Sequence, residues 1–128
     1  MLDTNIVSEL FRRPHGAVAS RISAVGEESI CTSIVVAAEL RYGARKSGSE
    51  QLRKRIDLLL SALEILPLEP PADRRYAEIR DHLTRRGALI GPNDLLIAAQ
   101  ALAADLTLVT ANTREFARVP SLRIENWL

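Results

Sequence analysis

The sequence predicts an α/β fold of three layers, with a mainly parallel sheet of about five short strands and helices on both of its faces. Short apolar runs alternate with longer helical patterns along the whole chain, and right-handed crossovers join parallel strands through such helices. A length of 128 residues, without repeats or low-complexity segments, suits one hydrophobic core. We therefore expect a single domain over residues 1–128.

The first 48 residues supply two strands and three helices. "MLD" is typical of a short strand, and "TNIVSELF" has helical spacing that Pro14 and Gly16 interrupt. "AVASRISAVG" predicts a second helix that ends at Gly26, and "SICTS" a second strand. Ser33 is then expected to cap the long helix "IVVAAELRYGARKSG", which ends at Gly48.

The rest of the chain supplies three helices and three strands. A helix with one apolar face is expected over 50–63, followed by "EILPL" as the third strand. Pro70 and Pro71 begin an amphipathic helix through "ADRRYAEIRDHLTRRG" that Gly87 closes. The stretch 90–112 contains the next helix and the fourth strand, and "LRIENW" predicts an edge strand.

Composition is that of a soluble globular protein, with 47% hydrophobic and 26% charged residues. A net charge of +1 neither requires nor excludes a nucleic-acid partner, and five aromatic residues argue against a base-stacking surface. Fifteen of the seventeen cations are arginine, which suits forked contacts to phosphate or carboxylate. Solvated helix faces explain most of these arginines, and Arg12 and Arg41 are candidates for phosphate contacts.

Cys31 is the only cysteine, so an internal disulfide is impossible and a reducing cytoplasm is expected. Its context predicts a buried strand residue rather than a catalytic thiol. Phe116 and Trp127 are expected in the core. The sequence shows no signal peptide and no long apolar run, so we expect a cytoplasmic protein without a membrane partner.

Polar residues stand where predicted strands end and helices begin. Asp3 closes the first strand, and Asp94 lies in the first turn of a helix. Thr110 and Asn112 follow the fourth strand. In open parallel sheets ligands bind beyond the carboxyl ends of the strands, because helix N-termini and loops converge there. Each residue also has an ordinary explanation: Asp3 as a helix cap, Asp94 as a partner of the helix dipole, and Asn112 as a turn residue.

Glu39 lies on the long helix among apolar neighbours. Val35, Val36 and Tyr42 share its side of the helix at three- and four-residue spacing. The carboxylate is therefore expected to be half-buried, where a charge without a partner is costly. Because no arginine of the same helix stands three or four residues away, Glu39 needs a distant arginine, a proton or a metal ion.

If Asp3, Glu39 and Asp94 meet at one crevice, a divalent cation offsets their mutual repulsion best. An all-oxygen site with few carboxylates suits Mg²⁺ or Mn²⁺ rather than zinc. Such a site can activate water and bridge a phosphate, so hydrolysis of a phosphodiester is the natural chemistry. Thr110 or Asn112 could orient that water.

Other α/β proteins that gather carboxylates at strand ends fit less well. A receiver domain would need an Asp after the third strand and a Lys after a later one; "EILPLEPP" has no Asp, and Lys46 and Lys54 lie in predicted helices. A haloacid-dehalogenase-type phosphatase would need a second Asp where "LDTN" has Asn5. The sequence has neither a dinucleotide-binding fingerprint nor a phosphate loop of the GKT kind.

Three stretches, "MLDTNIVSEL", "TSIVVAAELRYGA" and "GPNDLLIAAQALAADLTLVTANTREFARVPSLRIENW", follow one another in this order between Met1 and Trp127. Together they resemble the PIN-domain ribonucleases, and among these the VapC toxins of bacterial toxin–antitoxin modules. The resemblance implies one PIN domain over residues 1–128, acting as a metal-dependent endoribonuclease that inhibits translation.

The resemblance also implies roles for individual residues. The family's carboxylates that match Asp3, Glu39 and Asp94 bind Mg²⁺ or Mn²⁺, and a fourth polar position matches Asn112, with Thr110 beside it. Many family members have Asp where this chain has Asn112, so the site carries one charge fewer. In-line attack of water on phosphorus, assisted by the metal, would leave 5′-phosphate and 3′-hydroxyl ends.

The partners implied by the resemblance are an RNA substrate, a cognate VapB-type antitoxin that places a basic side chain in the active site, and a second copy of the chain in a homodimer. The expected substrate is tRNA, and relatives with a similar C-terminal pattern cleave the anticodon loop of initiator tRNA. One alternative is a non-catalytic interaction domain whose acidic crevice accepts a basic segment of a partner. Another is a phosphatase or nucleotide hydrolase that releases phosphate from small substrates.

Overall fold

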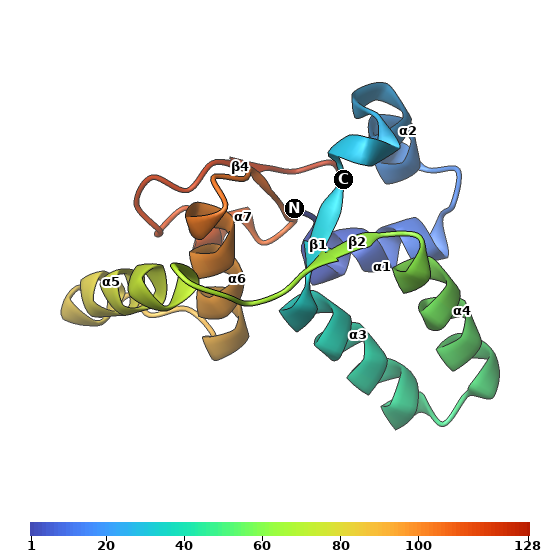
Figure 1. The fold of residues 1–128 in the computed structure, drawn as a ribbon, viewed down its shortest axis with the longest axis horizontal. Helices are drawn as coiled ribbons and strands as arrows, with labels where there is room; N and C mark the ends of the chain where they lie inside the picture. The colour runs from blue at the N-terminus through green and yellow to red at the C-terminus, as the bar shows by residue number, and fades with distance from the viewer.

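The computed structural model describes residues 1–128 and confirms the α/β class, with helices arranged around a narrow parallel sheet (Figure 1). The helices are α1 (Thr4–Arg12), α2 (Ala17–Val25), the 3₁₀ turn η1 (Glu27–Ser29), α3 (Ile34–Ser47), α4 (Glu50–Ser61), α5 (Ala72–Arg85), α6 (Pro92–Ala103) and α7 (Thr113–Phe116). The strands are β1 (Cys31–Ser33), β2 (Glu64–Leu66), β3 (Leu108–Val109) and β4 (Ile124–Glu125).

Leu2 stands at the centre of the sheet. β1 pairs in parallel with β2, β3 pairs in parallel with β4, and Leu2 bridges in parallel to both Thr32 and Val109. The order across the sheet is therefore β2, β1, Leu2, β3, β4. The predicted first strand is present as this single bridge, because α1 begins at Thr4 and leaves no room for a longer pairing.

Local signals set most helix ends. Ser33 accepts a hydrogen bond from the Val35 N–H at 3.0 Å, as predicted for the cap of α3, and Gly48 ends that helix with φ +70°. The helix predicted over 50–63 instead ends at Ser61, because a tight turn at 62–63 leads into β2.

The two prolines predicted to begin α5 precede it instead. The Pro71 carbonyl accepts hydrogen bonds from the N–H groups of Arg74 and Arg75, which makes Pro71 the cap and Ala72 the first helical residue. α7 and η1 were not predicted, since a helix of one turn has no periodicity to detect.

One apolar core fills the space between the helices and the sheet. α6 is its centre, with five of its apolar residues almost fully buried: Leu95, Ile97, Ala98, Ala99 and Ala101. Phe116 and Trp127 are buried, at 0% and 8% exposure, and so is Cys31. The predicted burial of Cys31, Phe116 and Trp127 is therefore confirmed.

None of the helices has the length and apolarity needed to cross a bilayer.

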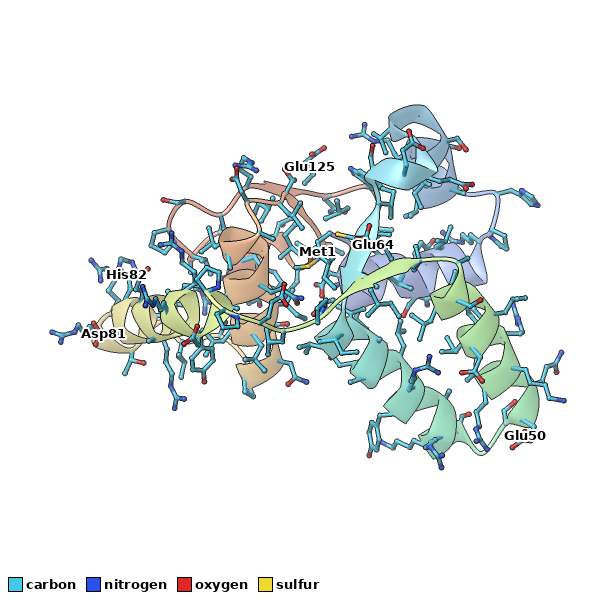
Figure 2. All side chains as sticks on the ribbon, viewed as in Figure 1. Met1, Glu50, Glu64, Asp81, His82 and Glu125 are labelled. Atoms are coloured by element: carbon cyan, nitrogen blue, oxygen red, sulfur yellow. The ribbon has the colours of Figure 1, made fainter.

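Most arginines lie on outer helix faces, as predicted. Arg53 pairs with Glu50 and Arg85 with Asp81, and Figure 2 shows Glu50 and Asp81 at the outer ends of α4 and α5, away from the sheet. These exposed pairs contribute little to stability. No salt bridge joins an arginine of α4 or α5 to a residue at the carboxyl edge of the sheet.

Candidate active site

The structure brings together all five residues that the sequence singled out, at the edge of the sheet where the parallel strands end. Asp3 directly follows the Leu2 bridge, and Thr110 directly follows β3. Glu39 lies on α3, and Asp94 lies in the first turn of α6. Asn112 precedes α7. Hydrogen bonds and charge interactions link these residues into one cluster.

Asp3 is held by two donors and is 4% exposed. Its Oδ1 accepts a hydrogen bond from the Thr4 N–H at 2.8 Å, which makes Asp3 the N-cap of α1. Its Oδ2 accepts a hydrogen bond from the Thr110 hydroxyl at 2.7 Å. The ordinary explanation of Asp3 as a cap is therefore correct, and the same carboxylate also belongs to the cluster.

Thr110 is completely buried and connects the loop after β3 to the start of α1. Besides donating to Asp3, its hydroxyl oxygen accepts a hydrogen bond from the Asn112 N–H at 2.9 Å. Asn5 makes a second connection, since its Oδ1 accepts from the Ala111 N–H at 3.0 Å. These contacts fix the loop that carries Asn112 relative to Asp3.

Glu39 is half-buried, as predicted, but its partner is a hydroxyl group. The Thr4 hydroxyl donates a hydrogen bond to Glu39 Oε1 at 3.0 Å, and Glu39 makes no salt bridge. The predicted apolar surroundings are partly wrong, because Tyr42 is 65% exposed. Glu39 is half-buried because α1 packs against α3, and not because its neighbours on α3 surround it. Arg41 pairs with Asp57 of α4 instead.

Asp94 has the clearest electrostatic signature of the cluster. Its pKa is raised from 3.8 to about 6, first by burial and further by the negative charges of Asp3, Glu39 and Glu115. Its only hydrogen bond in the chain comes from Asn112, whose Nδ2 lies 3.4 Å from Asp94 Oδ2. Carboxylates from four separate segments of the chain therefore lie close enough to interact electrostatically.

Glu115 is a member of the cluster that the sequence analysis missed. It lies in α7, three residues after Asn112. That spacing places two residues on the same side of a helical turn, so the segment "NTREF" contained the signal. Thr4 and Asn5 were expected as polar residues after the first strand but were given no role, because their contacts reach residues 35 and 106 positions away.

No basic side chain compensates this cluster. None of the eight salt bridges in the chain includes Asp3, Glu39, Asp94 or Glu115. Arg12 lies 3.7 Å from Glu9 on the surface of α1. Close carboxylates without a counter-charge repel one another, and a cation relieves that repulsion.

The donor set suits a hard divalent cation, although the side chains are not in ligand geometry. Glu39 Oε2, Asp94 Oδ1 and both oxygens of Glu115 accept no hydrogen bond, and no buried side-chain oxygen lacks a partner, so these oxygens reach solvent. All the donors are oxygen, as Mg²⁺ and Mn²⁺ prefer. As the side chains stand, however, no group of three or more His, Cys, Asp or Glu residues could hold a metal ion.

Comparison with known proteins assigns the fold to a family. The sequence model of the PIN domain matches residues 1–122. The chain belongs to the PIN-domain family. This PIN domain is 42% identical over 129 residues to Ribonuclease VapC2 of Rickettsia felis, an alignment that covers 99% of the chain and 96% of that relative. It is 37% identical over 131 residues to the tRNA(fMet)-specific endonuclease VapC of Shigella flexneri, covering 99% and 96%.

Solved structures agree with this assignment. The crystal structure of VapBC2 from Rickettsia felis, bound to a DNA fragment from the promoter, contains a chain that matches this PIN domain with a TM-score of 0.93. The two are 39% identical, and the match covers 100% of this chain and 98% of the other. DNA-bound VapBC from Salmonella typhimurium matches with a TM-score of 0.89 and 34% identity, covering 100% and 97%. The predicted resemblance to VapC is thereby confirmed.

Proposed function

We propose that this PIN domain is the endoribonuclease toxin of a type II toxin–antitoxin module and that it inhibits translation by hydrolysing phosphodiester bonds of tRNA with Mg²⁺ or Mn²⁺. The observation that carries the proposal is the cluster of Asp3, Glu39, Asp94 and Glu115, which lies at one edge of the sheet and has no basic partner. Relatives named ribonuclease VapC support the reaction class.

Asp3, Glu39 and Asp94 are the proposed metal ligands. Two neutral donors hold Asp3, and one neutral donor holds each of the others, so no basic side chain competes with a cation for these carboxylates. A divalent cation supplies activation of water and offsets the charge that builds on phosphorus during the attack. Small movements of the unbonded oxygens, Glu39 Oε2 and Asp94 Oδ1, with the bond from Thr4 to Glu39 Oε1 kept, would bring the ligands together once a cation offsets their repulsion.

Thr110 and Asn112 take different roles in this proposal. The Thr110 hydroxyl is buried, and its hydrogen goes to Asp3, so it positions that carboxylate rather than contacting substrate. Asn112 is half-buried, and its amide donates to Asp94 while its Oδ1 accepts no hydrogen bond. Asn112 is therefore the better placed of the two to orient the attacking water.

The proposed partners follow from the relatives. Crystal structures of similar chains are of VapBC complexes, so we expect a VapB-type antitoxin to bind this chain. A basic side chain of the antitoxin would offset the same negative cluster that a cation offsets. A homodimer is the expected oligomeric state, and a tRNA substrate sets the reaction in the cytoplasm. The Shigella flexneri relative is named as specific for tRNA(fMet), so initiator tRNA is the first substrate to test.

The test is to incubate the purified chain with total tRNA and Mg²⁺ and to sequence the fragment ends. We expect cuts in the anticodon loop of initiator tRNA, 5′-phosphate and 3′-hydroxyl ends, and complete loss of cleavage in EDTA. Asp3→Asn should abolish cleavage and Asp57→Asn, an exposed aspartate on α4, should not. Circular dichroism checks that both variants are folded.

Three results would overturn the proposal. Cleavage by Asp3→Asn at the wild-type rate would rule out Asp3 as a metal ligand. Cleavage that persists after all divalent cations have been removed would rule out a metal-dependent reaction. Release of inorganic phosphate from small phosphate esters, without tRNA cleavage, would favour a phosphatase. Tight binding of a basic peptide by a chain that cleaves no RNA at any Mg²⁺ or Mn²⁺ concentration would favour a non-catalytic interaction domain.

A further inference from the structure

Thr4 joins two of the clustered carboxylates through its own two donors. Its backbone N–H donates to Asp3 Oδ1 at 2.8 Å, and its side-chain hydroxyl donates to Glu39 Oε1 at 3.0 Å. Asp3 precedes Thr4 directly, whereas Glu39 comes from α3, 35 residues later. A single residue therefore connects the end of the central strand to the helix that carries Glu39.

The local structure explains why this residue can reach both groups. Thr4 is the first residue of α1, where the backbone N–H has no partner within the helix and is available to the Asp3 cap. α1 packs against α3, so the Thr4 side chain faces Glu39 across the contact between the two helices. The residue is half-buried, which shields its hydrogen bonds partly from water.

The Thr4 hydroxyl is the only hydrogen-bond donor of the chain that Glu39 has. No arginine or lysine pairs with Glu39, and its Oε2 accepts nothing. A glutamate side chain has three rotatable bonds, so without this contact the carboxylate of a half-exposed residue would sample several rotamers. Fixing Oε1 limits that sampling and leaves Oε2 without a hydrogen bond, available to a cation.

We propose that Thr4 is a positioning residue whose hydroxyl holds the Glu39 carboxylate ready for a divalent cation. The expected effect of Thr4 on cleavage rests on the proposed function. The expected effect of the Thr4 hydroxyl on the order of the Glu39 side chain does not depend on that function. Second-sphere hydrogen bonds to ligating carboxylates generally change metal affinity by about 10- to 100-fold when they are removed. Thr4 acts through Glu39 and needs no contact with the RNA.

The experiment compares Thr4→Val, Thr4→Ala and Thr4→Ser in the full chain. Val keeps the shape of Thr and removes the hydroxyl, Ala removes the hydroxyl without the branched side chain, and Ser keeps the hydroxyl. Thr84→Val removes an exposed hydroxyl from α5 and is the matched control. Mn²⁺ binding is measured directly by electron paramagnetic resonance without RNA, and side-chain order of Glu39 is measured by NMR couplings in EDTA.

We expect Thr4→Val and Thr4→Ala to bind Mn²⁺ about tenfold more weakly than the wild type. Thr4→Ser should restore binding to within about twofold, and Thr84→Val should leave it unchanged. Cleavage by Thr4→Val should recover when the Mn²⁺ concentration is raised, because the defect is in cation binding and not in the attack on phosphorus. The Glu39 couplings should become averaged in Val and Ala and stay ordered in Ser.

The inference is overturned if Thr4→Val and Thr4→Ala both keep an ordered Glu39 and wild-type Mn²⁺ affinity. It is also overturned if Thr4→Ser is as defective as Val, since retaining the hydroxyl would then fail to restore Mn²⁺ binding. If the wild type binds no Mn²⁺, the proposed metal-dependent function fails by itself. The Glu39 couplings in EDTA still decide in that case whether the Thr4 hydroxyl orders the carboxylate.

Discussion

The Thr110 hydroxyl donates a hydrogen bond to the Asp3 carboxylate at 2.7 Å, although the two residues are 107 positions apart in the sequence. The contact exists because Leu2 pairs with Val109, which places the residues that follow them side by side at the same edge of the sheet. Both side chains are buried, so the charge of Asp3 is stabilised by this neutral donor and by the Thr4 N–H. The pairing of Leu2 with Val109 at the centre of the sheet thus positions Asp3 and Thr110 in the candidate site.

Thr110→Val should destabilise the protein, because it leaves Asp3 Oδ2 and the Asn112 N–H without their shared partner. Removing one partner of a buried hydrogen bond generally costs about 1–3 kcal/mol of unfolding free energy. Thr110→Ser keeps the hydroxyl and should lose less. Urea unfolding in EDTA measures both, and equal stability of Val and wild type would contradict the assigned contact.

Asp94→Asn should stabilise the metal-free protein at neutral pH. An aspartate with a raised pKa in the folded state holds its proton more tightly when folded, so losing that proton disfavours the fold. This destabilisation is absent below the ordinary pKa of 3.8, grows as the pH rises, and is complete above about 6. Asn carries no charge and avoids it.

Urea unfolding of wild type and Asp94→Asn in EDTA, from pH 4 to pH 8, checks the sign. The stability advantage of Asn should be small at the acid end and increase through about pH 6. Asp57→Asn, at an exposed position, should not show this increase. An advantage that is constant with pH would mean that the charge of Asp94 is not the cause.

Glu115→Gln should lower the pKa of Asp94, because it removes one of the three negative charges that raise it. Glu50→Gln, at the start of α4 and outside the cluster, should leave the pKa of Asp94 unchanged. Carboxyl carbon chemical shifts recorded by NMR across a pH titration measure the change. The same pKa of Asp94 in all three proteins would show that Glu115 lies too far away to belong to the site.

Gln100→Leu should cost about 1–3 kcal/mol of unfolding free energy, because the buried Gln100 side chain makes three hydrogen bonds at once. Its Oε1 accepts from the Ser33 hydroxyl, and its Nε2 donates to the carbonyls of Leu66 and Pro67 at 2.9 and 3.0 Å. Gln51→Leu changes an exposed glutamine of α4 and should alter stability by less than about 0.5 kcal/mol. Thermal unfolding of the two variants decides, and a similar loss in both would contradict the assignment.

The sequence was sufficient for the order of the longer helices and the strands, and for most of the candidate site. Ser33 and Gly48 define the ends of α3 through bonds to neighbours within a few positions, and such local signals are visible without a structure. Asp3 and Asp94 could be chosen because carboxyl ends of parallel strands share one edge, wherever the helices pack. Binding of the metal ion remains a prediction from the sequence and from the structure alike.

Only the tertiary structure could show that Leu2 is the central strand, since one bridged residue has no periodicity. It also revealed Thr4 as the partner of Glu39, Glu115 as a fourth carboxylate and Gln100 as the connection between α6 and two strand ends. Each of these depends on which distant segments pack together. Hydrogen bonds within a few residues follow from local sequence, whereas those between distant residues exist only after the whole core has formed.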